Sequence, residues 1–554
     1  MYKEFIPKSY LCLRSNYTFS IFKKDVIAGV TVGVIALPLA MAFAIASGVT
    51  PFQGLITAVI AGFCISAFGG SKVQIGGPTG AFVILIYDIV QRNGYEGLVA
   101  ATLLGAFFLL CLGIFRVGSW IKYVPYPLIT GFTTGLAVLI FSSQIKDFLG
   151  LSITNLPCHF VGKWSLYFTT MSTCELSTLC LSAGSLILIL LVRKFIPKLP
   201  WAITAITLST LVAYIFSLPV ETIYSRFGEI PNHFPSISFP KITISNRNLT
   251  EIFLDGMAIA FLGGIESLLS AVIGDGMTGG RHKSNCELMG QGIANFASVL
   301  FGGIPATGAI ARTAVNIKSG AKTPVAGMVH ALTLLAIILF LAPVISYIPL
   351  PTLSAVLIMV AWNMSEIDHF IKLFKAPIGD VLILLTAFFL TVFVDITIAI
   401  CFGMVLASFL FMKRMSQFPK TISLTKEFSE EADSPLIISQ KNYSNIEIYE
   451  IQGPFFFGAA DILQDVLTNI ERAPKVFILK LHDVTFIDAS GMHALKEFYE
   501  RCKKEKTILL LAELQGEVKK DLVKFGFIKT LGKEHVFPSL EKALAKAKEE
   551  VNKN

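Results

Sequence analysis

Two short, near-identical stretches constrain this chain more than any other feature of its sequence. They read GPTGA at residues 77–81 and GIPATGA at residues 303–309, and each interrupts a hydrophobic run. Because proline and glycine interrupt helices, each stretch predicts a half-helix whose N-terminus lies inside a bilayer. Such an end carries roughly half a positive elementary charge and unsatisfied N–H groups, which suit a bound anion. Interrupted spans at matching positions in two halves of a chain are typical of a repeat-built transporter.

The composition predicts a large membrane domain followed by a smaller soluble one. A mean hydropathy of +0.68, with 54% hydrophobic and 15% charged residues, excludes an ordinary soluble protein. Apolar stretches of spanning length recur through most of the chain, and the C-terminal part is instead rich in Lys, Glu and Asp. We expect a cytoplasmic N-terminal segment, a transmembrane anion-transport domain, a linker and a cytoplasmic domain, at residues 1–24, 25–415, 416–436 and 437–554.

The apolar runs predict fourteen spans, seven in each half of the membrane domain. The first seven lie near 25–46, 51–69, 74–90, 97–115, 124–148, 176–195 and 200–217, and the second seven lie near 250–273, 286–302, 306–318, 324–345, 350–364, 377–394 and 396–413. An odd number per half inserts the second half upside down, so the two half-helices approach each other from opposite faces. The alternative is two independent kinks that ease helix packing. Loops on the side of the termini hold 19 Lys and Arg residues against 6 on the other side. The positive-inside rule therefore predicts a multi-pass protein of the inner (plasma) membrane with both termini cytoplasmic.

Several functional classes are excluded by what the sequence lacks. The net charge of +8 follows the loop topology and so indicates no nucleic-acid partner. The nine cysteines form no CxxC pair, and no metal constellation is visible, so we expect neither a metal nor a cofactor. No nucleophile–base arrangement is visible either, and we expect no enzyme activity. The expected partners are the lipid bilayer, a small inorganic or organic anion, and protons.

Two ionisable residues lie within expected spans. Arg312 follows Thr307 by five residues, and a charge at the bilayer centre costs about 2.5–3.5 kcal/mol, so it should face a cavity or a partner. We interpret it as a fixed cation for a bound anion; the alternative is a structural ion pair. Glu266 is a proton carrier by default, because desolvation favours the neutral acid. The alternative is a permanent salt bridge between Glu266 and Arg312. Glu266 could also fill both roles one after the other, if substrate displaces its carboxylate from Arg312.

The expected anion site combines the two half-helix tips with this arginine, and Glu266 couples it to protons. The expected substrate-binding residues are Gly77, Pro78, Thr79, Gly80, Ala81, Ala306, Thr307, Gly308, Ala309 and Arg312.

The C-terminal segment reads as alternating strands and helices. Strands are expected at 446–451 and 476–481, with a helix at 458–472 between them and another opening at Asp488-Ala-Ser490-Gly. Such alternation predicts an open sheet flanked by helices.

These motifs resemble the SulP family of anion transporters. The matching stretches are 25–33, 37–42, 76–81, 303–314 and 316–324. The resemblance implies an α-helical membrane fold of fourteen spans in a 7+7 inverted repeat, with a core domain that rocks against a gate domain. It also implies a homodimer, and an anion site between the third and tenth spans.

Within that family, residues 264–269, 275–279 and 361–366 resemble the bacterial C4-dicarboxylate branch. The resemblance assigns proton coupling to the acid at Glu266. One departure is Leu39, where many eukaryotic sulfate members carry a glutamine, and this puts their substrate choice in doubt here.

The C-terminal segment is similar to a STAS domain, the fold of anti-sigma-factor antagonists. That resemblance implies a regulatory phosphosite at Ser490 and a cytosolic protein partner; the alternative reading of Ser490 is a simple helix N-cap.

The combined expectation is a secondary active transporter that takes up sulfate or a C4-dicarboxylate with protons by alternating access. Alternatives are a bicarbonate transporter, an uncoupled anion exchanger or channel, and a membrane sensor that signals through the STAS domain.

Overall fold

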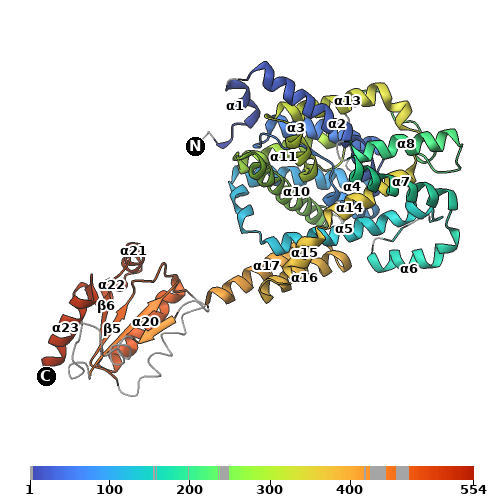
Figure 1. The fold of residues 1–554 in the computed structure, drawn as a ribbon. Helices are drawn as coiled ribbons and strands as arrows, with labels where there is room; N and C mark the ends of the chain where they lie inside the picture. The colour runs from blue at the N-terminus through green and yellow to red at the C-terminus, as the bar shows by residue number, and fades with distance from the viewer. Residues whose placement is uncertain are drawn as a thin grey trace. The chain divides into compact units, whose positions relative to one another are not determined.

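The computed structural model describes residues 4–15, 17–153, 156–157, 159–196, 199–234, 236–237, 249–416, 420–423, 445–456 and 473–553. The chain divides into two compact units, residues 1–404 and 405–554. Figure 1 labels the elements of both.

Helices make up nearly all of the first unit. They are α1 (Lys8–Arg14), α2 (Phe19–Ala46), α3 (Pro51–Phe68), α4 (Gly80–Ile114), α5 (Tyr126–Leu149), α6 (Phe160–Thr170), α7 (Leu176–Phe195), α8 (Trp201–Ile215), α9 (Ile223–Phe227), α10 (Leu249–Thr278), α11 (Ser284–Leu300), α12 (Ile310–Lys318), α13 (Val325–Ile345), α14 (Leu350–Met364), α15 (Ile367–Leu373), α16 (Ile378–Phe393) and α17 (Ile396–Ser416). The short strands β1 (Gly76–Gly77) and β2 (Thr307–Gly308) and two 3₁₀ segments, Val117–Tyr123 and Met171–Thr173, also belong to this unit, and α17 begins in it and ends in the second.

The expected spans all fall on helices. Nine helices in the described part of the chain are long and apolar enough to cross a bilayer, and α8 and α16 are shorter apolar helices. The expected third and fourth spans form one helix, α4, with a break at Gly94, where φ is 66°. The third and tenth spans begin their helices only at Gly80 and Ile310, because β1 and β2 occupy the residues before them. That each of the fourteen segments crosses the bilayer stays a prediction.

The helices of the first unit pack in two groups. The first group contains α2, α3, α4, α10, α11, α12 and α13, and the second contains α5, α7, α8, α14 and α16. The family resemblance implies a core and a gate domain, and that these two groups correspond to them stays a prediction. Close approach within the first group depends on small residues: a Cβ on Gly29 of α2 would lie 2.4 Å from the carbonyl oxygen of Ala326 in α13.

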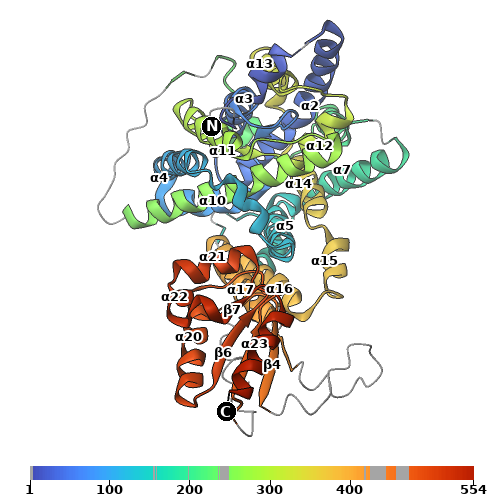
Figure 2. The same cartoon turned by 90° about the vertical axis from the view of Figure 1, so that its left-hand side faces the viewer.

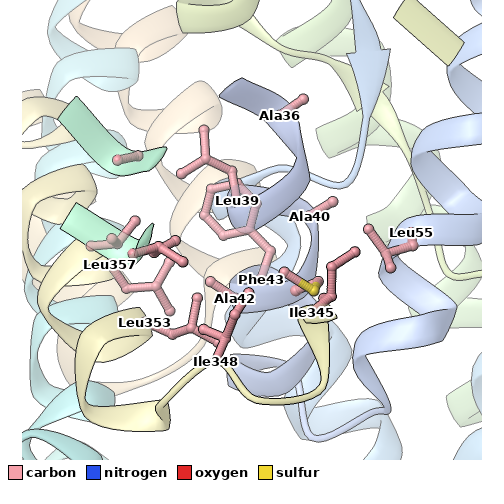
Figure 3. Close-up of a cluster of buried hydrophobic side chains, with 14 of the residues drawn as sticks. Ala36, Leu39, Ala40, Ala42, Phe43, Leu55, Ile345, Ile348, Leu353 and Leu357 are labelled. Carbon is pink, nitrogen blue, oxygen red and sulfur yellow. The ribbon is translucent and has the colours of Figure 1, made fainter. Parts of the chain in front are cut away.

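A buried apolar cluster joins the two groups. Figure 3 shows Leu39 and Phe43 of α2 among side chains of α14 such as Leu353 and Leu357. These four side chains are each less than a tenth exposed. Leu39 therefore serves packing at the junction of the groups, at the position where a glutamine would place an amide.

The second unit is a five-stranded sheet covered by helices on both faces. Its elements are β3 (Lys420–Ser423), β4 (Ile446–Gln452), β5 (Val476–Lys480), α20 (Ala489–Lys504), β6 (Ile508–Ala512), α21 (Gly516–Lys524), α22 (Phe527–Leu531), β7 (Val536–Phe537) and α23 (Leu540–Asn552). The strand order is β3-β4-β5-β6-β7, with β4 to β7 parallel and β3 antiparallel to β4.

Alternate residues along the strands pack on opposite faces of this sheet. Phe477 and Leu509 join the cluster of α20, α21 and α22, whereas Ile478 and Leu510 join that of α23. Figure 2 shows the same helices around the sheet. The strands expected at 446–451 and 476–481 are present, and the helix expected at 458–472 lies outside the described residues. The segment 416–436, expected to be a linker, contributes strand β3, because its residues 420–423 pair with the edge of β4.

Candidate functional site

The two near-identical stretches lie side by side in the structure. Strands β1 and β2 pair antiparallel, with Gly76 opposite Gly308 and Gly77 opposite Thr307. Each strand leads directly into the helix that follows it, α4 or α12. The two tips therefore meet while their chains run in opposite directions, as inverted half-helices do. Two unrelated kinks would have no reason to pair.

Most polar atoms of the second tip are hydrogen-bonded to other parts of the protein. The Thr307 hydroxyl donates to the Gly263 carbonyl at 2.9 Å and lies 2.8 Å from the Ser267 hydroxyl. The Gly308 N–H donates to Ser267 Oγ at 3.0 Å, and the Ala309 N–H donates to the Ile75 carbonyl at 2.8 Å. Because Thr307 has one proton to give, Ser267 must donate to it. These bonds fix the shape of the second tip against α10.

Other groups at the tips keep hydrogen-bonding capacity. The first N–H groups of α4, at Gly80 and Ala81, have no acceptor among the described residues, and neither do those of α12 at Ile310 and Ala311. The Thr79 hydroxyl is buried and likewise without a partner in the described part of the chain. The backbone donors available to an anion are therefore the first N–H groups of the two helices.

Arg312 connects the two tips. Its guanidinium is buried, and Nη2 donates to the Pro78 carbonyl at 2.8 Å. Nη1 has no partner among the described residues and would lie 2.7 Å from a Cβ on Gly77. The guanidinium carbon lies 6.0 Å from the centre of the Phe43 ring, within cation–π range. A residue of the second half thus places its charge at the tip of the first half, with one donor uncommitted.

The site lies at the junction of the two helix groups. A Cβ on Gly80 would lie 3.2 Å from Met364 Sδ, 3.4 Å from Ile140 Cδ1 and 3.5 Å from Phe43 Cε1. Ile140 and Met364 belong to α5 and α14 of the second group, whereas Gly80 and Phe43 belong to the first. Motion of one group against the other would therefore change what covers the first tip.

Glu266 is not brought together with Arg312. Its carboxyl is buried on α10 and lines a small apolar cavity with Leu128, Phe132 and Ile400. Ser267, the next residue, faces the second tip, and successive helical side chains point about 100° apart. Within the described residues, Glu266 has no cation within 4.0 Å, so a permanent salt bridge to Arg312 is absent from this structure. Glu266 instead faces α5 and α17.

The reading of Ser490 as an N-cap is wrong. Asp488 caps α20, because its side chain accepts from the Gly491 N–H at 2.8 Å. Ser490 is exposed at the second position of the helix. A phosphosite there stays a prediction.

Sequence reasoning missed the residues that hold the tips in place. Ser267 binds the second tip from α10, and Asn295 of α11 binds both the N–H and the carbonyl of Ala306 at 2.7 and 2.9 Å. Ser267 directly follows Glu266 in sequence, so it belongs to a stretch that already stands out. For Asn295 a signal existed in the polar residues spaced by four along 287–298, within an otherwise apolar segment.

Comparisons with known proteins agree with this architecture. The sequence profile of the Sulfate permease family matches residues 22–387, and that of the STAS domain matches residues 438–543. The protein named "Putative sulfate transporter YvdB" of Bacillus subtilis is 42% identical over 524 residues, which cover 94% of this chain and 97% of that one.

Two solved structures share the fold. The murine Slc26a9 anion transporter, in its inward-facing state, superposes with a TM-score of 0.86 at 17% identity, covering 98% of this chain and 94% of that one. The transmembrane domain of a cyanobacterial bicarbonate transporter, BicA, superposes with a TM-score of 0.61 at 28% identity, covering 71% of this chain and 98% of that one. The chain therefore belongs to the sulfate permease family, whose members are membrane anion transporters and not enzymes, and it carries a C-terminal STAS domain.

Proposed function

We propose that this chain takes up sulfate together with protons by alternating access. The observation that supports this most is the antiparallel pairing of Gly77 with Thr307, since it brings two helix N-termini and the Arg312 guanidinium to one place. Helix dipoles and a guanidinium together compensate the charge of a compact oxyanion. The Bacillus subtilis relative, whose name assigns sulfate to it, supports the same substrate.

The geometry favours a compact anion over a C4-dicarboxylate. A dicarboxylate carries two separated charges, which two separated sets of cations or N–H donors compensate best. Of the described residues, only Arg312 and Lys163 are buried cations, and Lys163 lies against Tyr87, two turns along α4 from the tip. The uncommitted Nη1 of Arg312 and the free first N–H groups of α4 and α12 lie at the tips instead. Bicarbonate is a second candidate, because it is equally compact and the BicA transmembrane domain is 28% identical to this chain.

Glu266 is proposed to carry the proton. An ionised carboxylate in an apolar cavity without a cation is costly, so the acid should cross the membrane neutral. A bound anion nearby favours the protonated form further. Transporter loaded with both anion and proton then carries less negative charge than transporter loaded with the anion alone, so the proton favours movement of the anion.

Uptake by proteoliposomes tests the substrate. Labelled sulfate and succinate are each offered at an external pH of about 5 and about 7, and labelled bicarbonate only at the higher pH, because acid converts it to carbon dioxide, which crosses the bilayer unaided. We expect sulfate uptake that rises at the lower pH. Faster uptake of succinate than of sulfate would contradict the compact site, and uptake of bicarbonate alone would select the second candidate.

Two variants test the roles of the charged residues. Arg312→Ala should weaken sulfate binding by at least about tenfold, the usual value of a charge-assisted hydrogen bond, while Arg312→Lys retains part of it. Glu266→Gln should keep sulfate exchange but lose accumulation driven by a proton gradient. If the Glu266→Gln variant still concentrates sulfate in that gradient, the proton follows another route.

The remaining expectations accompany this proposal. We propose a homodimer in the inner membrane, with both termini cytoplasmic and a cytosolic protein partner at the STAS domain. Crosslinking the protein in the same liposomes and measuring the size of the product tests whether it is a dimer.

A further inference from the structure

One face of α11 carries a row of fully buried polar side chains that the anion site does not use directly. Glu287, Gln291, Asn295 and Ser298 each have an exposed fraction of 0%. Their spacing of four, four and three residues places them on one side of the helix. We call them the α11 polar row. Buried polar groups in an apolar helix are costly unless each is hydrogen-bonded, so their partners show what they hold.

The first member of the row holds the segment that enters β1. Glu287 Oε2 accepts from the Gly70 N–H at 2.8 Å and from the Ser71 N–H at 3.1 Å. A Cβ on Gly70 would lie 2.9 Å from the Glu287 backbone nitrogen, so the two segments are in direct contact. The chain reaches the first tip only six residues later.

The next two members carry the connection along the helix to the second tip. Gln291 Nε2 donates to Glu287 Oε1 at 2.9 Å, and Asn295 Nδ2 donates to the Gln291 carbonyl at 2.8 Å. Asn295 Oδ1 accepts from the Ala306 N–H at 2.7 Å, and Nδ2 donates to the Ala306 carbonyl at 2.9 Å. One amide side chain thus satisfies both backbone groups of the residue that precedes β2.

The last member, Ser298, binds the same loop two residues before Ala306. Ser298 Oγ donates to the Ile304 carbonyl at 2.7 Å. The Ile304 N–H donates to the Thr57 hydroxyl of α3 at 2.7 Å. The loop that carries the second tip is therefore fastened to α11 at two points and to α3 at a third.

We infer that the α11 polar row is a positioning device that sets the register of the two half-helix tips, and that Asn295 is its key residue for anion affinity. Its members hold the segments before β1 and before β2 to one rigid helix. Since the donors of the two tips converge on one anion, a shift of either tip would misplace them. The affinity claim rests on the proposed function; the claim about the register does not.

Asn295→Ala in the full-length protein is the direct test, and Asn285→Ala is its matched control. Asn285 lies on the same helix and accepts from the Gly118 N–H at 3.1 Å, away from both tips. Hydrogen exchange of the segment 303–309 is measured without substrate, and the KM and maximal rate of sulfate uptake are measured in liposomes. We expect Asn295→Ala to speed exchange of this segment and to raise KM about tenfold with little loss of maximal rate. Asn285→Ala should change neither.

Two further arms keep the result decisive. If Asn295→Ala does not fold, Ser298→Ala removes a single bond of the row and should show the same changes at smaller size. Unchanged exchange in 303–309 would overturn the inference, as would equal effects of the Asn285 and Asn295 variants. If the wild-type protein takes up no sulfate, the proposed substrate is wrong, and the exchange measurement still decides whether the row holds the tip.

Discussion

At the residue scale, Gly77 is a position where a single added methyl group should damage the site. Its φ of 151° is a conformation that residues with a Cβ rarely adopt, and a Cβ there would lie 2.7 Å from Arg312 Nη1. Gly77→Ala should therefore strain the first tip and displace the guanidinium. We expect sulfate KM to rise about tenfold, the effect of roughly 1–3 kcal/mol of strain. Gly184→Ala, with no atom within 4 Å of its added Cβ, is the control and should leave KM unchanged.

At this scale the sequence identified the charged residues and helix breaks of the site, but not the residues that they contact. The Pro-Gly stretches and Arg312 stand out in the sequence because a helix break or a charge in a membrane span costs free energy unless it has a partner. The structure places them together. The partnership of Glu266 with Arg312 was a reasonable pairing of opposite charges. It is absent because Glu266 lies on the side of α10 that faces α5, which depends on helix rotation and packing. Asn295 was missed for a different reason: it binds the backbone of Ala306, and a backbone partner leaves no side-chain signal in the sequence.

At the scale of elements, α6 contacts both helix groups, so their relative motion should affect it. Trp164 Nε1 donates to Ser142 Oγ at 3.2 Å and Tyr167 donates to the Ser142 carbonyl at 2.8 Å, which fastens α6 to α5. Lys163, buried on the same helix, lies over the Tyr87 ring of α4 with Nζ 5.4 Å from its centre. This helix therefore touches both groups at once.

Lys163→Met should change the rate of transport but not the affinity. The substitution keeps the apolar stem and removes a cation–π contact of about 0.5–2 kcal/mol between the groups. Since Lys163 lies away from the tips, we expect a severalfold change in the maximal rate of sulfate uptake and an unchanged KM. A raised KM would place Lys163 on the path of the anion instead. Lys146→Met, at the end of α5, serves as the control.

For the whole molecule, the sequence predicted the helices and the α/β domain, but it did not predict the short strands that form by pairing of distant segments. Hydrophobic runs in a membrane chain mark helices directly, and all fourteen expected segments are helical. The strand-like alternation at 446–451 and 476–481 likewise identified the α/β unit. These short strands depend on pairing between residues that are far apart in the sequence. The residues before Gly80 and Ile310 form strands only because they meet each other, and residues 420–423 form a strand only because β4 offers them an edge.

The two compact units should divide the work of the molecule. Every group that holds or surrounds the tips lies in the first unit, within residues 1–404. A chain that ends at residue 416 should therefore bind sulfate with the affinity of the full protein, to within about twofold, since it retains all of these groups. Arg312→Ala in that shortened chain should weaken binding as it does in the full chain, which shows that the same site is measured. A shortened chain that folds but prefers bicarbonate or succinate would mean that the STAS domain takes part in substrate choice.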